Sequence, residues 1–322
     1  MPLSALISGY IRARMGRKEP YFATYNVTYR CNSRCTYCDY WRRDWDELGT
    51  EDALTVVRRI ADSGARVLDF SGGEPSLRRD IVLLMKESHD RGLFTSLSTN
   101  GLSVPGWLVE GASRYADAVT ISLDGPEQVH DRTRGVPGGY RRAVEAIRAY
   151  RRAGVRTGIS IVLSRENAGS VERLLQEVED EVDYITFQPV NPPQGFRIPE
   201  EDLAALMKRR RKIVLPDEYF RNVSAYSEGR FGKVCDALDL YFSVDPLGNL
   251  NPCPLRSDVK LGSLVSRSFR EIMEASYEEG RRAVESCSGC YLACTVGVSY
   301  QMKEPLRKSM ISALRYAVSG LI

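Results

Sequence analysis

Short apolar segments alternate with amphipathic segments between residues 22 and 190, and this alternation constrains the fold more than any other feature. The apolar segments are rich in Val, Ile and Phe, as buried parallel strands are, and they lie at 22–28, 66–70, 94–98, 118–123, 157–163 and 184–187. Helices are predicted at 50–63, 79–91, 140–153 and 170–182. Six βα units are fewer than the eight of a closed barrel. We therefore expect an α/β fold, a partial (β/α)6 barrel of the TIM type.

The pattern changes after residue 190. Turn residues occupy 191–195, a helix is predicted around 200–214, a small hairpin at 241–253 and a helix at 268–285. A chain of 322 residues can hold the barrel and a small second unit. The predicted division is an N-terminal amphipathic helix (1–20), the barrel (21–195), a linker with a helix (196–229), a small hairpin and helix domain (230–300) and a C-terminal amphipathic helix (301–322).

Eight cysteines fall into three groups, at positions 31, 35 and 38, at 235 and 253, and at 287, 290 and 294. The N-terminus does not look like a secretory signal, because Arg12 and Arg14 interrupt its apolar stretch. We therefore expect a cytoplasmic protein, in which thiols stay reduced and clustered cysteines bind metal more often than they form disulfides.

Composition excludes some sites and partners. The only two histidines, His89 and His130, are too few for a His-rich zinc or non-haem iron site. A net charge of +3 gives no reason to expect nucleic acid, which needs clustered positive charge. No run of 18 apolar residues occurs, so no membrane span is expected.

The first cysteine group follows the first predicted strand directly, as Cys31-Asn-Ser-Arg-Cys35-Thr-Tyr-Cys38. The loops at the carboxyl ends of barrel strands carry the chemistry of such folds. Three thiolates can bind three irons of a [4Fe–4S] cubane and leave the fourth iron open to another ligand. A structural zinc site is the alternative, but it needs a fourth ligand that this segment does not provide.

The CxxxCxxC spacing, with Tyr37 before its last cysteine, resembles the radical S-adenosylmethionine (SAM) superfamily. Three further motifs strengthen the resemblance over residues 20–190. Ser71-Gly72-Gly73-Glu74-Pro75 resembles the GGEP motif of that superfamily, Ser98-Thr99-Asn100-Gly101 follows the third strand, and Ser122-Leu-Asp124-Gly125 ends the fourth, with Arg134 soon after. All of these motifs are predicted at strand carboxyl ends, where they face one cavity.

The resemblance implies that one electron from the cluster cleaves SAM, giving methionine and a 5′-deoxyadenosyl radical that removes hydrogen from a substrate carbon. It also implies an electron donor of the ferredoxin or flavodoxin type. The catalytic cluster ligands would be Cys31, Cys35 and Cys38. The residues expected at SAM are Tyr37, Gly72, Gly73, Glu74, Pro75, Thr99, Asn100, Ser122, Asp124, Arg134, Ser160 and Gln188. A strand-end cap is an equally good interpretation of Ser160 and Gln188.

The later cysteines resemble the SPASM and twitch extensions of the same superfamily. Cys235 and Cys253 flank a predicted hairpin with Gly248 in its turn, and Cys287, Cys290 and Cys294 follow. Five thiols are enough for one auxiliary [4Fe–4S] cluster with four ligands, which leaves one cysteine spare. The sequence does not identify the spare one. A zinc ribbon remains the alternative.

Both ends of the chain, near 3–15 and 306–321, have apolar residues at helical spacing together with Arg and Lys. Such helices can lie on a membrane surface, although packing against the barrel is the commoner use. The leading hypothesis from this feature is a lipid or isoprenoid substrate, with peripheral contact at the membrane. The alternatives are modification of a ribosomally made peptide, or dehydrogenation, decarboxylation or epimerisation of a sugar-like small metabolite.

Overall fold

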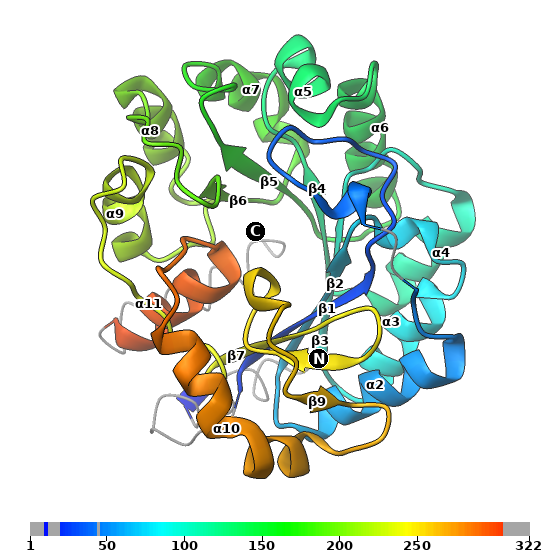
Figure 1. The fold of residues 1–322 in the computed structure, drawn as a ribbon. Helices are drawn as coiled ribbons and strands as arrows, with labels where there is room; N and C mark the ends of the chain where they lie inside the picture. The colour runs from blue at the N-terminus through cyan, green and yellow to red at the C-terminus, as the bar shows by residue number, and fades with distance from the viewer. Residues whose placement is uncertain (1–9, 12–19, 44–45, 305–322) are drawn as a thin grey trace.

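The computed structural model describes residues 10–11, 20–43 and 46–304 (Figure 1). Six parallel strands form the barrel, and each pairs with the next in sequence. They are β1 (Phe22–Thr28), β2 (Val67–Gly72), β3 (Phe94–Thr99), β4 (Ala118–Ser122), β5 (Thr157–Leu163) and β6 (Tyr184–Pro189). All six predicted strands are confirmed, with bounds that differ by at most two residues. The α/β partial barrel is therefore confirmed.

Helices cover the outer face of this sheet (Figure 1). They are α2 (Thr50–Asp62), α3 (Ile81–Asp90), α4 (Gly106–Tyr115), α5 (Glu127–Arg134), α6 (Gly139–Arg152) and α7 (Val171–Val178). Their buried sides join the outward residues of the strands in one core, with members such as Ile60, Leu84, Ile147 and Leu174. The sequence did not predict α4 or α5. Helix α5 is mostly polar, so no apolar stripe announces it.

The chain between β6 and the next strand forms two helices, α8 (Glu200–Lys208) and α9 (Asp217–Ser227). The single helix predicted over 200–214 is therefore too long. It ends early because Ile213 returns to the sheet as a bridge to Ile185, and Pro216 then starts α9. Short helical turns occur at η1 (Tyr40–Arg42), η2 (Pro75–Leu77), η3 (Glu179–Glu181) and η4 (Pro254–Arg256).

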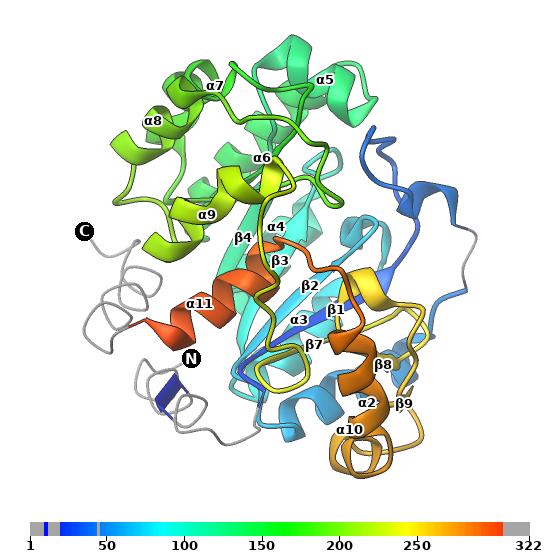
Figure 2. The ribbon, with the colours of Figure 1, turned by 60° about the vertical axis from the view of Figure 1, so that its left-hand side comes forward.

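The C-terminal unit continues the barrel sheet (Figure 2). Strand β7 (Tyr241–Val244) pairs parallel with β1, and β8 (Asn249–Asn251) and β9 (Gly262–Ser263) extend it in antiparallel fashion. Helix α10 (Phe269–Glu285) begins at a capping box in which Ser268 and Glu271 exchange hydrogen bonds. The π-helical turn η5 (Ala293–Gly297) and helix α11 (Val298–Lys303) follow. Tyr241 and Ser243 thereby stand beside Phe22 and Thr24 of the barrel.

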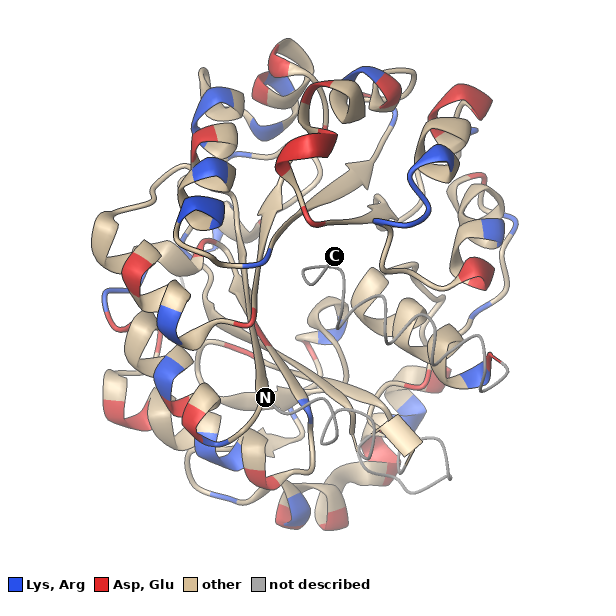
Figure 3. Cartoon of the chain, turned by 180° about the vertical axis from the view of Figure 1, so that it is seen from behind, with Lys and Arg blue, Asp and Glu red and all other residues tan. Residues whose placement is uncertain are grey.

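The amphipathic helices predicted for the two ends lie almost wholly outside the described residues. Of the first, Tyr10 is described, and its hydroxyl donates to the carbonyl of Gln301 at 3.1 Å. In the described part of the chain, no helix has the length and apolar character needed to cross a membrane. Basic and acidic side chains are interspersed over the outer helices (Figure 3).

Candidate active site

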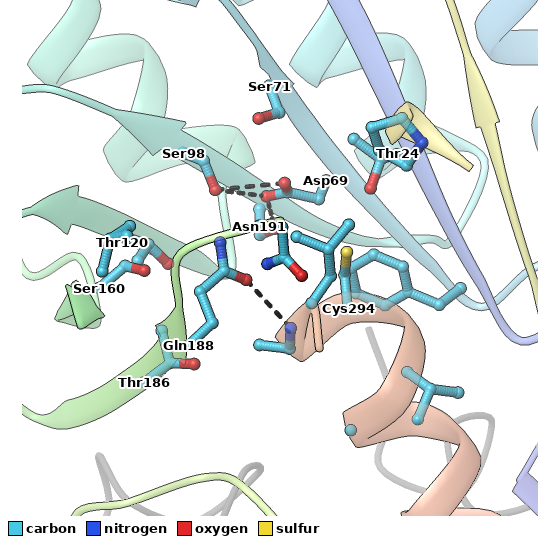
Figure 4. A pocket seen from close by; sticks show the side chains of 18 of the residues that line it. Thr24, Asp69, Ser71, Ser98, Thr120, Ser160, Thr186, Gln188, Asn191 and Cys294 are labelled. Carbon is cyan, nitrogen blue, oxygen red and sulfur yellow. Dashed lines mark hydrogen bonds between the residues drawn. The ribbon is translucent and has the colours of Figure 1, made fainter. Parts of the chain in front are cut away.

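A cavity of about 630 Å³ occupies the inside of the barrel. Alternate residues of the strands line it, and most of them carry hydroxyl groups (Figure 4). These hydroxyl side chains are Thr24, Ser71, Ser96, Ser98, Thr120, Ser122, Ser160 and Thr186. The other residues of the same strands, such as Tyr25, Phe70 and Ile121, face the helices and are fully buried. The barrel therefore has an apolar outer layer and a hydroxyl-lined inner wall around Asp69, whereas apolar side chains such as Val67, Leu215 and Val298 line the rest of the cavity.

Asp69 is the acidic side chain that β2 places in this polar interior. Its carboxylate accepts hydrogen bonds from the hydroxyls of Ser96 and Ser98, the latter at 3.0 Å. Burial raises the pKa of Asp69 to about 6, although both serines work against the rise. Asp69 was not among the predicted site residues. Polar residues stand at every second position of several strands, and this alternation indicates a polar face toward the barrel interior, but the strands were interpreted only as apolar.

The first cysteine loop lies at the carboxyl end of β1, as predicted. Cys38 lines the cavity, and so does Tyr37. Burial raises the pKa of all three thiols, that of Cys31 to about 11. Cys35 is buried and Cys31 and Cys38 are half-buried, so the three thiols favour their neutral form unless positive charge is brought to them. The donor set therefore fits a cationic iron–sulfur cluster, which three thiolates can hold with one iron left open.

Polar donors already point at two of these sulfur atoms. The backbone N–H of Ser33 and the amide of Asn100 approach Cys31 Sγ at 3.4 and 3.9 Å. One guanidinium nitrogen of Arg134 approaches Cys35 Sγ at 3.8 Å. Hydrogen bonds to the sulfurs are among the contacts by which a protein tunes an iron–sulfur cluster.

Glu74 and Asn100 connect the loops after β1, β2 and β3. The fully buried carboxylate of Glu74 accepts hydrogen bonds from the Ser76 N–H at 3.0 Å, and from the Thr99 hydroxyl and Asn100 N–H at 2.7 Å each. The Asn100 amide donates to Asn32 at 2.7 Å. The hydrogen bonds of both side chains are therefore made within the protein itself. They hold the cysteine loop in place.

The two motif glycines are required by contact with the cysteine loop. A Cβ on Gly72 would stand 2.2 Å from the Thr28 carbonyl oxygen, and one on Gly73 would stand 2.2 Å from the Arg30 carbonyl oxygen. Gly72 also has φ of +126°, which L side chains rarely adopt. The close approach that these glycines permit is thus made by the protein's own backbone. Pro75 begins the short turn η2 just after them.

Arg134 and Asp124 form a buried pair beside the cavity. The guanidinium binds both carboxylate oxygens, at 2.6 and 3.0 Å, and the Tyr37 hydroxyl donates to the same carboxylate at 2.8 Å. Burial acts to raise the pKa of Asp124, but the charge and hydrogen bonds of Arg134 outweigh it and hold that pKa below its usual value. Arg134 and Tyr37 line the cavity, and Asp124 orients both.

Of the remaining residues predicted to contact SAM, some line the cavity and others lie in the hydrogen-bonded network around Glu74. Ser122, Ser160 and Gln188 all line the cavity. Gln188 Oε1 also accepts a hydrogen bond from the backbone N–H of Ala293 at 3.0 Å, so it holds the start of η5 (Figure 4). Thr99 and Asn100 lie behind the lining, in the hydrogen-bonded frame around Glu74.

The second cysteine group is spread over the C-terminal unit. Cys235 precedes β7, Cys253 follows β8, and Cys287 and Cys290 follow α10. Burial raises the pKa of Cys235 and Cys253, and the nearby Cys290 thiolate adds to the rise in both. Within the described residues, no three Cys, His, Asp or Glu side chains converge as they would around one metal ion. A cubane instead places each thiolate on a separate iron.

Two family models match the chain. Residues 25–178 match the radical SAM superfamily, and residues 235–291 match SPASM, an iron–sulfur cluster-binding domain. The first match spans the barrel strands β1 to β5 and the first cysteine group. The second spans four of the five later cysteines and ends before Cys294.

Curated relatives resemble the chain over about half of its length. Fe-coproporphyrin III synthase of Methanosarcina barkeri is 27% identical over 61% of this chain and 53% of its own. Pre-heme d1 synthase of Dinoroseobacter shibae is 33% identical over 53% and 43%, and PqqA peptide cyclase of Bradyrhizobium diazoefficiens is 32% identical over 47% and 41%. The chain thus spans about half the length of the curated relatives it matches.

Solved structures show the same fold at low identity. SuiB of Streptococcus suis superposes with a TM-score of 0.66, at 16% identity, over 91% of this chain and 76% of that one. The enzyme anSMEcpe with bound AdoMet gives 0.64, at 17% identity, over 92% and 97%. The cysteine loop, the matched models and the shared fold agree, and the chain belongs to the radical SAM superfamily as an enzyme with a C-terminal SPASM iron–sulfur domain.

Proposed function

We propose that this enzyme removes a hydrogen atom from a C–H bond of a small hydroxylated or amine-bearing metabolite. The observation that supports this most is the polar interior of the barrel. Hydroxyl side chains from all six strands line the cavity around the carboxylate of Asp69. A substrate there must satisfy these groups, because a buried polar group without a hydrogen bond costs about 1–3 kcal/mol.

A lipid substrate fits the hydroxyl-lined wall of this cavity poorly. An alkyl chain against that wall would displace water from the hydroxyls and from Asp69 and would offer no hydrogen bond in return. The apolar lining on the other side, with residues such as Leu215 and Val298, could contact the carbon skeleton of either kind of substrate. The names of the relatives point to porphyrin, haem and peptide chemistry. The predicted terminal helices, which motivated the lipid hypothesis, lie outside the described residues. The small-metabolite alternative is therefore the better supported hypothesis.

A peptide is the second candidate, and a specific observation favours it. PqqA peptide cyclase is 32% identical over nearly half of this chain. A peptide side chain with a hydroxyl or amino group could reach Asp69 as a free metabolite does. The two candidates differ in how much of the ligand would stay outside the barrel.

The first cysteine group and its neighbours would hold the cofactors. Cys31, Cys35 and Cys38 would bind a [4Fe–4S] cluster, which with SAM supplies a 5′-deoxyadenosyl radical when bound. Arg134 is held by Asp124 and lines the cavity with Ser122, so these two can meet the SAM carboxylate. Tyr37 lies on the same wall.

Asp69 would orient the substrate. Its two oxygens face the cavity and can accept hydrogen bonds from an ammonium or hydroxyl group while Ser96 and Ser98 hold it in place. The surrounding hydroxyls can turn to donate or accept, so they suit a ligand with several polar groups. Bound substrate would fill the barrel and exclude water from the radical step.

The electron donor would meet the outer side of the first cysteine loop. Arg34 and Arg42 are exposed there, and their guanidinium groups lie 5.7 and 4.6 Å from the centre of the Trp41 ring. Positive charge beside the cluster loop suits an acidic redox protein of the ferredoxin or flavodoxin type.

The test is 5′-deoxyadenosine release by the anaerobically reconstituted enzyme with SAM and dithionite. Host metabolites below about 1 kDa, host peptides, porphyrins and a lipid extract are added separately. We expect stimulation by the small-metabolite fraction, and we expect Asp69→Asn to reduce that stimulation about 100-fold. Asp62→Asn, an exposed carboxylate on the outer surface, is the matched control. Stimulation by the lipid or porphyrin fraction alone would contradict the proposal.

A further inference from the structure

The five later cysteines do not share one environment. An auxiliary cubane needs four thiolates, so five cysteines leave one over. Cys294 lines the barrel cavity, whereas Cys235, Cys253, Cys287 and Cys290 do not. The SPASM match contains those four cysteines and ends at residue 291. Position in the fold and the family match therefore separate the same residue from the set.

The direction of the Cys294 side chain agrees with this division. In Figure 4 the side chain points into the same space as Asp69, and both residues line the cavity. The thiol therefore lies in the space that a substrate would occupy.

The structure holds Cys294 firmly at this place. The residue lies in η5, a single π-helical turn, a geometry that often marks functional sites. Two side chains from the end of β6 anchor the turn. Gln188 Oε1 accepts from the Ala293 N–H at 3.0 Å, and Asn191 Oδ1 accepts from the Tyr291 N–H at 2.8 Å. A thiol so anchored lines the same cavity as the side chains of β2 to β5, and it would contact a substrate bound there.

Tyr241 links Cys294 to the other cysteines. The Cys294 thiol lies 3.8 Å from the Tyr241 hydroxyl, and Tyr241 is 1% exposed. Tyr241 begins β7, in the segment between Cys235 and Cys253, so it connects the part of the chain that carries these cysteines to Cys294. It is the natural positioning residue for the thiol.

We propose that Cys294 is a hydrogen-atom donor to the substrate, so that the enzyme replaces one hydrogen on carbon by another and can invert that centre. The proposal rests on the proposed function, because it needs a substrate radical in the barrel. The Cys294 S–H bond breaks, a C–H bond forms on the substrate carbon, and the unpaired electron passes to sulfur. An S–H bond is weaker than most C–H bonds, so the transfer runs toward carbon.

The cycle closes with one electron and one proton. A low-potential redox protein, or dithionite in the assay, reduces the sulfur radical, and a proton restores the thiol. Each turnover then consumes two electrons, one for SAM cleavage and one for Cys294. The substrate itself is neither oxidised nor reduced, and its new hydrogen comes from solvent through the thiol.

The first test asks whether Cys294 is a cluster ligand and needs no substrate. Iron per chain is measured in reconstituted Cys294→Ala and in Cys290→Ala, the matched control. We expect the iron of wild type in the first variant and a loss of about one to four irons in the second. N-ethylmaleimide added anaerobically to the holoenzyme should modify Cys294 alone among the eight cysteines. Equal iron loss in the two variants, or a Cys294 that resists the maleimide, would overturn the proposal.

The second test follows hydrogen. The enzyme turns over in D2O with dithionite and the metabolite fraction below about 1 kDa. The recovered material is exchanged back into H2O, and the deuterium that remains bound to carbon is divided by the 5′-deoxyadenosine formed. We expect about one deuterium per 5′-deoxyadenosine in wild type and at least a tenfold lower ratio in Cys294→Ala. Tyr241→Phe should lower the ratio less. A wild type without deuterium, or a Cys294→Ala variant with the wild-type ratio, would refute hydrogen donation.

The two proposals fail in different ways. If no aqueous fraction stimulates 5′-deoxyadenosine release, the proposed function is wrong, and hydrogen donation falls with it. If the fraction stimulates release but deuterium stays out of the substrate, the proposed function stands and the role of Cys294 is wrong.

Discussion

The two cysteine groups can both supply thiolates to an iron–sulfur cluster, but they are arranged differently along the chain. Cys31, Cys35 and Cys38 lie within eight residues on one loop, and two side chains contact that loop, Asn100 from the loop after β3 and Arg134 from the end of helix α5. The later cysteines come from a strand start, a hairpin end and the segment after α10. A compact motif can be recognised from its spacing, whereas a dispersed one acquires its meaning from the fold. Cys294 shows this, because its spacing left it, with Cys287, among the doubtful ligands, whereas its place in the cavity lining separates it from the other four cysteines.

The largest expected effect is the loss of about half of the bound iron when cysteines of the second group are removed. Replacing Cys235 and Cys253 together with Ala should lower the iron per chain from about eight to about four. Cys31, Cys35 and Cys38 would keep their share because no later cysteine contributes to their loop. Iron and sulfide analysis after reconstitution measures this. An unchanged iron content would mean that the C-terminal unit holds no cluster.

The frame around the first group depends on the Asp124–Arg134 pair. Asp124→Ala leaves a buried guanidinium without its partner and should cost about 3–5 kcal/mol of stability. The pKa of Asp124 is lowered in the folded state, so its contribution is present above the usual carboxyl pKa and is lost as pH falls through the lowered value. The variant should therefore differ from wild type at pH 7 and much less in acid below the lowered pKa of Asp124.

Denaturation of the metal-free chain by urea at both pH values measures this difference. Arg141–Glu127, an exposed ion pair, is the control, and Glu127→Ala should change stability by less than about 1 kcal/mol. Equal losses in Asp124→Ala and Glu127→Ala at pH 7 would contradict the account of the buried pair.

Gly73→Ala should sharpen the role of the glycines. Its Cβ would stand 2.2 Å from the Arg30 carbonyl oxygen, so the cysteine loop would have to move, at a cost of roughly 2–4 kcal/mol. Gly106→Ala meets nothing within 4 Å and should stay within about 0.5 kcal/mol. Thermal midpoints of both variants, with their iron contents, test the difference. A Gly73→Ala protein with normal iron and stability would show that the close contact is not required.

Asp69→Asn should give the smallest effect on stability, and the variant should be more stable than wild type rather than less. The pKa of Asp69 is raised to about 6, so stability is greatest when it is protonated and falls as pH rises through 6. The variant removes this cost and should melt about 2–5 °C higher than wild type at pH 8, but not at pH 4. A lower midpoint at pH 8 would show that the ionised carboxylate stabilises the barrel.

Much of the barrel could be predicted because each strand carries its own signal. The bounds of β1 and β5 were predicted to the residue, since apolar runs end there at turn or loop residues. Helices α4 and α5 were missed because their buried faces are short and their sequences are rich in Gly or charge. A helix can be predicted from its local sequence pattern only where its buried face is long enough to give a clear apolar stripe.

Site residues that belong to a short sequence motif could be predicted. Site residues that come together only through the packing of the sheet could not. The first cysteine loop lies at the carboxyl end of β1, as predicted. Asp69 was missed because a single acidic residue in an apolar strand gives no indication in the sequence that it faces a cavity. Glu74 and Asn100 were predicted to contact SAM, and in the structure they make hydrogen bonds to other protein groups. Which of five cysteines turns into the barrel depends on how η5 packs against β6, and spacing alone cannot predict that.

The most direct test of the central claim is 5′-deoxyadenosine release by the variant with Cys31, Cys35 and Cys38 all replaced by Ala. The reconstituted protein is incubated anaerobically with SAM and dithionite beside wild type, and its iron is counted. The account predicts no release above background, with about four irons retained by the C-terminal unit. SAM cleavage at the wild-type rate in this variant would contradict it.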